Sequence, residues 1–185
     1  MKFFLLVLLI INTVSAGQLI NEFNFSASTD GLYKLKDGRV FEASSLDGHL
    51  KNNVGSYGKI KCNSLIETKK SELIFLKVIC EISLNDGNTI WSVLERSSSS
   101  FKAGVGESTI IDATGKYSKI IGTKCIYAVT KYKNSSFVKE QCEVNDKFLV
   151  NLKINNLVKT SKWLPSKNEI HSHKGFKRVC IIEWE

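Results

Sequence analysis

The sequence is poor in proline and in long apolar runs. Its single proline is Pro165, and no second long apolar run follows the one at the start of the chain. A membrane-spanning helix needs about 20 consecutive apolar residues, so nothing after that first run is long enough to span. Helical periodicity is also scarce, which argues against a helical bundle and indicates a chain built mainly of strands.

The first sixteen residues have the pattern of a secretory leader. Lys2 precedes the apolar run Phe3–Ile11, and the small residues Ser15 and Ala16 end the stretch. A cation, a short apolar core and small residues in this order predict a leader over residues 1–16 and a mature chain that starts at Gly17. We therefore expect a secreted or periplasmic protein, with a single domain over residues 17–185.

The chain has five cysteines, which in an exported protein favour structural disulfides over catalysis. Two pairs are symmetric about polar turn segments, so that their members stand opposite each other if the flanking strands form hairpins. Opposite residues of an antiparallel pair have Cβ atoms about 4.5–5.5 Å apart, close enough for a bridge. We predict the bridges Cys62–Cys80 and Cys125–Cys142. Cys180 is left over, either as a buried thiol, which we favour, or as an intermolecular bridge.

Short runs of alternating apolar and polar residues fill most of the chain. Over Ile74–Leu84, for example, the even-numbered apolar residues share one face, and Lys77 and Glu81 lie on the other. Asp-Gly pairs between the runs predict hairpin turns at residues 30–31, 37–38, 47–48 and 86–87. About ten candidate strands, including one over residues 148–154, predict an all-β fold: an antiparallel meander closing into a barrel of about eight strands, with a two-sheet sandwich as the alternative.

Four glycines interrupt the strand-like run from Gly104 to Gly122. Glycine in a strand permits the bulges and sharp bends that a strongly coiled sheet needs. A phosphate-binding loop is excluded, because Thr109 stands where the dinucleotide pattern requires a third glycine and no lysine-hydroxyl pair follows Gly106. The glycines therefore indicate a curved sheet and not a cofactor site.

The same region carries a family resemblance. A Gly-x-Gly strand, the turn Thr114-Gly-Lys-Tyr117, and a glycine before the strand Cys125-Ile-Tyr127 resemble the allene oxide cyclase-like barrel group, which includes dirigent-type proteins. The resemblance covers Gly104 to Tyr127. It implies an eight-stranded antiparallel barrel with a central, often apolar cavity, in which some members carry out a cyclisation or coupling reaction. None of the group's catalytic positions can be matched here, so the resemblance assigns no active site.

Positive charge gathers in the C-terminal part of the chain. Residues 155–175 have no clear period and predict a long loop or a strand pair. This segment is a candidate for binding an anionic surface, such as a phosphorylated glycan or a lipid headgroup, through Lys159, Lys162, Trp163, Lys167 and Lys174. The alternative, which we favour, is that the lysines only keep an exported protein soluble. The leader argues against nucleic acid as the partner.

Few residues are candidates for chemistry. Three acids near the glycine-rich strands face either a cavity or the outer surface: Glu107, Asp112 and Glu140. Two histidines in an extended segment, with a third elsewhere, are weak candidates for a metal site: His171, His173 and His49. A zinc site normally needs three or four ligands, so we predict no metal and no cofactor.

The sequence therefore leaves three functional hypotheses open. The first, which we favour, is a non-enzymatic barrel that binds a small apolar ligand or an anionic surface. The second is an isomerase or cyclase that uses the barrel interior, as the family resemblance implies. The third is an envelope or structural component that Cys180 links to a partner. Two or more ionisable groups converging in the cavity would favour chemistry, and an apolar wall would favour binding.

Overall fold

The computed structural model of the chain describes residues 16–96, 103–133 and 135–161. Within these ranges the chain forms eight strands, one 3₁₀ helix and one α-helix. Their bounds are β1 Ala16–Lys34, β2 Arg39–Asn52, β3 Tyr57–Lys69, β4 Glu72–Leu84, β5 Thr89–Arg96, β6 Ala103–Ala113, η1 Gly115–Ile120, β7 Lys124–Tyr132, β8 Ser135–Asn145 and α1 Asp146–Ser161. Of the predicted leader, only Ala16 lies among the described residues, so the leader stays a prediction.

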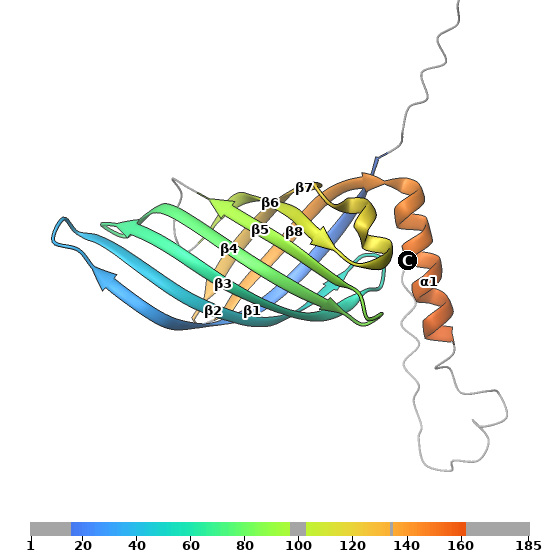
Figure 1. The fold of residues 1–185 in the computed structure, drawn as a ribbon, viewed down its shortest axis with the longest axis horizontal. Coiled ribbons are helices and arrows are strands. Elements are labelled where there is room, and N and C mark those ends of the chain that lie inside the picture. Colours follow the sequence, from blue (N-terminus) through green and yellow to red (C-terminus); the bar gives the residue numbers. More distant parts are fainter. Residues whose placement is uncertain (1–15, 97–102, 134, 162–185) are drawn as a thin grey trace, which may run out of the picture.

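The eight strands form a closed antiparallel barrel (Figure 1). Each strand pairs with its neighbours in sequence, and β1 also pairs with β8, so that Asn21 lies opposite both Asn52 and Glu140. The predicted meander and barrel are confirmed, and the sandwich alternative is wrong.

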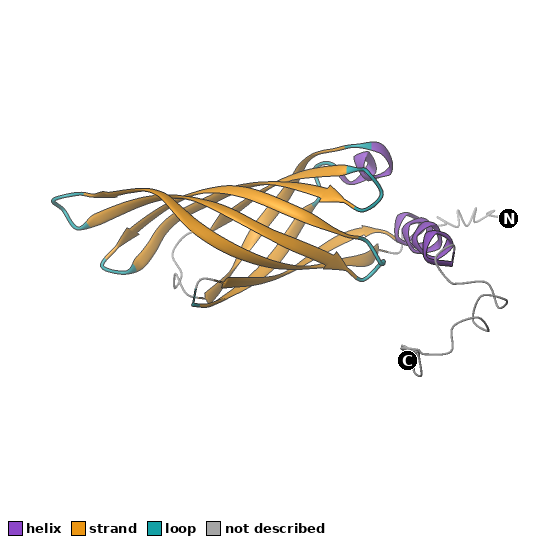
Figure 2. Ribbon diagram, turned by 90° about the horizontal axis from the view of Figure 1, so that it is seen from below, coloured by secondary structure: helices purple, strands orange, loops and turns teal. Residues whose placement is uncertain are grey.

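The two ends of the barrel differ. Both helices lie at one end, which we call the helix end, and the β1–β2 and β3–β4 turns lie at the other, the hairpin end (Figures 1 and 2). Buried apolar side chains from all eight strands fill the interior, and Tyr117, Phe148 and Leu152 add to this core at the helix end. The ring of Phe148 meets that of Tyr117 edge-on, with 6.1 Å between centroids.

Both predicted disulfides are present, and both lie inside the barrel. Cys62 and Cys80 join β3 to β4 with Cα atoms 4.1 Å apart, and Cys125 and Cys142 join β7 to β8 with Cα atoms 4.2 Å apart. In each case the two cysteines are directly opposite residues of a hairpin. Both pairs are those that the symmetric spacing of the cysteines predicted.

Cys180 lies outside the described residues, and a count of free thiols decides its state. Four of the five cysteines are in bridges, so the unfolded, unreduced protein should react with one equivalent of a thiol reagent, and with five after reduction. Alkylation followed by mass spectrometry measures both numbers. A value of zero before reduction, together with a dimer on a non-reducing gel, would instead support the intermolecular bridge.

The segment after β8 corrects one prediction. Residues 148–154, expected as a strand, belong to α1, and so does the beginning of the expected loop over residues 155–175. Phe148, Leu149 and Leu152 are buried, whereas Val150 and Ile154 are each 53% exposed, which is the spacing of one helix face. Asn145 begins the helix by accepting a hydrogen bond from the backbone N–H of Lys147.

The Asp-Gly pairs give turns at only two of the four expected places. Residues 37–38 and 86–87 lie in turns, with positive φ at both glycines. Gly31 instead follows a register shift within β1, and Gly48 lies inside β2. A Cβ atom at Gly48 would come 2.1 Å from the backbone oxygen of Asn24. Gly48 is thus required for close strand contact and not for a turn.

A bulge also changes which apolar residue of β4 points inward. The register of β3 and β4 shifts between Glu67 and Thr68. As a result Leu73 is 2% exposed and packed inside, while Ile74, expected on the inner face, is 39% exposed. From Leu76 to Leu84 the inner face is as predicted.

Among the described residues, none of the helices is both long and apolar enough to cross a membrane.

Candidate functional site

The three candidate acids point in different directions. Glu107 and Asp112 are exposed on the outer face of β6, and Glu140 is buried inside the barrel on β8. The structure therefore does not bring these acids together. Of the three, only Glu140 belongs to the interior.

Glu140 is held by two side chains from neighbouring strands. Asn21 Nδ2 donates a hydrogen bond of 2.8 Å to one carboxyl oxygen, and Ser108 Oγ donates to the other. Burial raises the pKa of Glu140, and these two hydrogen bonds oppose the shift. Both oxygens have partners, so the arrangement is that of a satisfied polar group inside the core.

The raised pKa gives a pH-dependent stability. As pH rises, the unfolded chain loses this proton before the folded protein does, so the unfolding free energy falls from about pH 4.5 through the folded pKa. Glu140→Gln retains a group that can accept from Asn21 and donate to Ser108. We expect the urea midpoint of the wild type to decline between pH 4.5 and 8 more steeply than that of the variant. Equal slopes would contradict the assignment, and the exposed Glu107→Gln is the control.

The metal candidates do not form a site in the described residues. His49 is exposed on β2, and His171 and His173 lie outside the described ranges. Within those ranges, three potential ligand atoms gather at Cys125, Glu140 and Cys142. The two sulfur atoms form a disulfide, and metal binding requires thiolates. The cluster therefore offers a metal only the carboxylate.

A cavity of about 70 Å³, partly open to the outside, lies in the hairpin half of the barrel. Its walls are mainly apolar, and its lining includes Phe25, Leu46, Ile66, Val78, Leu94 and Val138. One water needs about 10–15 Å³ measured in this way, so the cavity has room for roughly five waters. Two larger hollows, of about 590 and 700 Å³, lie on the outer surface around Val105. Of these three, the inner cavity is the one lined mainly by core side chains.

Three residues bring ionisable groups to this cavity: Arg96 from β5, and Tyr127 and Lys131 from β7. Burial lowers the pKa of Arg96, and Tyr127 opposes this shift. Burial raises the pKa of Tyr127, against the effect of Arg96. Burial also lowers the pKa of Lys131, with Glu42 opposing the shift and Arg96 adding to it. These groups therefore lie close enough to influence one another's ionisation.

Gly106 makes room for Tyr127. The two residues are opposite each other on β6 and β7, and a Cβ atom at Gly106 would lie 2.6 Å from the ring and hydroxyl of Tyr127 and 2.8 Å from the backbone oxygen of Glu95. Backbone on one side and a buried ring on the other leave no space for a side chain. This glycine of the Gly104–Gly122 run thus leaves space for a ring inside the barrel.

Gly106→Ala should therefore strain the core. We expect a loss of about 1–3 kcal/mol in unfolding free energy, the usual cost of overpacking, measured by urea unfolding of the oxidised protein. Gly31→Ala is the matched control, since the nearest atom to its added Cβ is 3.6 Å away. A loss no greater than that of the control would show that the Tyr127 ring moves aside freely.

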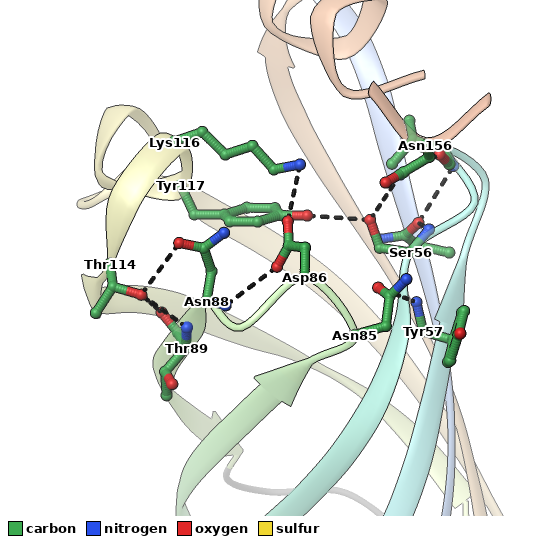
Figure 3. Close-up of polar contacts among 12 residues, drawn as sticks. Ser56, Tyr57, Asn85, Asp86, Asn88, Thr89, Thr114, Lys116, Tyr117 and Asn156 are labelled. Carbon is green, nitrogen blue, oxygen red and sulfur yellow. Dashed lines mark hydrogen bonds and ion pairs between the residues drawn. The ribbon is translucent and has the colours of Figure 1, made fainter. Parts of the chain in front are cut away.

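The helix end is closed by a polar network (Figure 3). The hydroxyls of Tyr117 and Ser56 are 3.0 Å apart, and Asn156 Nδ2 donates to Ser56 Oγ at 3.1 Å and to the backbone oxygen of Val54 at 2.7 Å. Burial raises the pKa of Tyr117 to about 12. The network fastens α1 and η1 to the β2–β3 turn, so the helix end is covered.

The basic candidates mostly lie outside the described residues. Lys159 is in the last turn of α1, and Lys162, Trp163, Lys167 and Lys174 belong to the part that is not described. The anionic-surface prediction is therefore untested by the structure.

Comparisons with protein-family models and with curated proteins found no match to this sequence.

Arg96, Tyr127 and Lys131 were not among the candidate site residues predicted from the sequence. The signal was present, because Ile90, Ser92, Leu94 and Arg96 alternate along β5 in the way that inward-facing residues do. Following the alternation of β7 to its end likewise leads from Cys125 through Tyr127 to Lys131. A charged residue at the end of an inward-facing series is thus a marker for a polar group inside a barrel.

Proposed function

We propose that this protein is an exported, non-enzymatic binding barrel that takes a small apolar ligand into the cavity of its hairpin half. The observation that carries the proposal is a mainly apolar hollow in the barrel interior, lined largely by core side chains. Buried apolar cavities bind small apolar molecules, because the cavity offers little to water. Export is supported by the leader pattern and by the two disulfides, which persist in oxidising compartments.

The size of the cavity limits the ligand. Pockets for drug-sized molecules measure about 300–1,000 Å³, whereas this cavity is about 70 Å³. A ligand of about five or six non-hydrogen atoms fits this space, by comparison with the waters that fill the same volume. The function we propose is therefore binding of a small molecule, without large movement of the wall.

Binding is favoured over a cyclase or isomerase by the position of Glu140. This buried acid does not line the cavity, and both of its oxygens accept hydrogen bonds from protein side chains. A general acid or base must reach the reacting atom directly or through one water. The remaining ionisable groups that line the cavity are Arg96, Tyr127 and Lys131, which suit recognition of a ligand.

Filling the cavity should abolish binding. Val138 is 7% exposed and lines the cavity, so Val138→Phe would occupy much of the space. We expect benzene to cause saturable chemical-shift changes in NMR spectra of the oxidised wild type, confined to residues around the cavity, and to cause none in the variant. Val105→Phe, on the outer face where Val105 is 63% exposed, is the control and should bind like the wild type.

Two outcomes would contradict the proposed binding. If benzene binds with the same affinity to Val138→Phe and to the wild type, the cavity is not the binding site. If the wild type shows no saturable change, the barrel does not bind small apolar molecules. Native mass spectrometry of protein taken from its source would then show whether another ligand accompanies it.

A further inference from the structure

Part of one edge of β1 has no strand partner among the described residues. β8 pairs with β1 only as far as Ser26, whereas β1 continues to Lys34 and stays paired with β2 on its other edge. Residues 27–34 of β1 therefore present backbone N–H and C=O groups along an edge that no described strand covers. Such an edge can pair with a strand of another chain.

This edge belongs to a hairpin that projects from the barrel. Figures 1 and 2 show the β1–β2 hairpin extending beyond the β3–β4 hairpin beside it. A bulge interrupts the edge, because the register of β1 and β2 shifts between Thr29 and Gly31. After the bulge, Leu32 is 50% exposed and Tyr33 is 68% exposed. A bulge shortens the part of an edge that can pair, but exposed apolar residues beyond it favour a partner that covers them.

The sequence of this edge is complementary to itself in antiparallel pairing. If two copies pair about Leu32, this residue meets its counterpart, and Gly31 of each copy lies opposite Tyr33 of the other. The same register places Asp30 opposite Lys34. Facing opposite charges stabilise an antiparallel pair, and an aromatic ring beside an edge glycine covers its exposed backbone. This complementarity favours a second copy of the chain as the partner.

The residues around Leu32 have room for this pairing. The nearest atom to a Cβ added at Gly31 is 3.6 Å away, in the ring of Tyr33, so the glycine leaves space beside the strand. One carboxyl oxygen of Asp30 accepts a hydrogen bond from Ser45 Oγ. Lys34 forms no ion pair with any residue that the structure describes. Its charge is therefore not neutralised within this part of the chain.

We propose that two copies of this protein associate through their β1 edges, in antiparallel register centred on Leu32, so that the two hairpins form one continuous sheet. Both copies use the same surface, so the association closes as a dimer and does not extend into a fibre. Only five residues of each copy pair, so the dimer is weak and reversible. This inference goes beyond the proposed ligand binding and does not depend on it.

A cysteine at the centre of the register traps the dimer. Because Leu32 lies opposite its counterpart, with Cβ atoms about 4.5–5.5 Å apart, Leu32→Cys should form an intermolecular disulfide under mild oxidation. The measurement is the dimer fraction on a non-reducing gel, with Cys180→Ser in every protein so that Cys180 contributes no bridge. Leu65→Cys, on a residue that is 48% exposed, is the matched control and should remain mainly monomeric.

A charge exchange tests the register itself. Sedimentation velocity of the oxidised, full-length protein carrying Cys180→Ser should show a dimer whose fraction rises with concentration. Lys34→Asp and Asp30→Lys should each weaken the dimer by about three- to tenfold, because each places like charges opposite one another twice. The double variant restores opposite charges and should dimerise like the parent protein. If Asp30→Lys does not fold, Lys34→Asp and the cysteine trap still test the register.

Three results would overturn the inference. The first is a protein that stays monomeric at every concentration. The second is an equal dimer fraction for Leu32→Cys and Leu65→Cys. The third is a dimer that Lys34→Asp leaves unchanged, which would place the contact on another surface. None of these results bears on benzene binding in the cavity, so the proposed function is tested separately.

Discussion

Pairing of β1 with β8 closes the sheet, and this closure determines what every strand places inside. Once the ring of hydrogen bonds is complete, alternate residues of each strand face a space of fixed width. That space holds the apolar core, both disulfides and Glu140. A side chain inside this space must therefore fit its neighbours on the adjacent strands. Where the neighbours leave no room for a side chain, as at Gly106, the residue is glycine.

One inward-facing row shows how the closed barrel joins the polar core to the cavity. Asn21 lies opposite Glu140 across β1 and β8, Glu140 lies opposite Tyr127 across β8 and β7, and Tyr127 lies opposite Gly106 across β7 and β6. Asn21 donates a hydrogen bond to Glu140 from β1. The Tyr127 ring lies against Gly106 on β6, on the side away from β8. Glu140 is thus kept out of the cavity, while Tyr127 lines it.

Much of this fold could be predicted from the sequence, because hairpins are local. The symmetric spacing of the cysteines identified both bridges, and alternation identified the inward-facing residues of β4 from Leu76 to Leu84. The errors arose where the local pattern was ambiguous or silent. Phe148 and Leu152 suit a strand face and a helix face alike, and the bulge at Ile74 has no marker in composition. The partners of Glu140 and the space at Gly106 depend on strands that are distant in sequence, so no local pattern could reveal them.

The β1–β8 seam also constrains the order in which the chain can fold. Asn21 and Glu140 are 119 residues apart, whereas every other strand pair joins neighbours along the chain. Because the chain is synthesised from its amino terminus, one edge of β1 stays unpaired until β8 has been made. An unpaired strand edge can associate with other chains. The nascent protein is most exposed to aggregation just before its last strand emerges, so a chaperone that shields that edge would act at this stage.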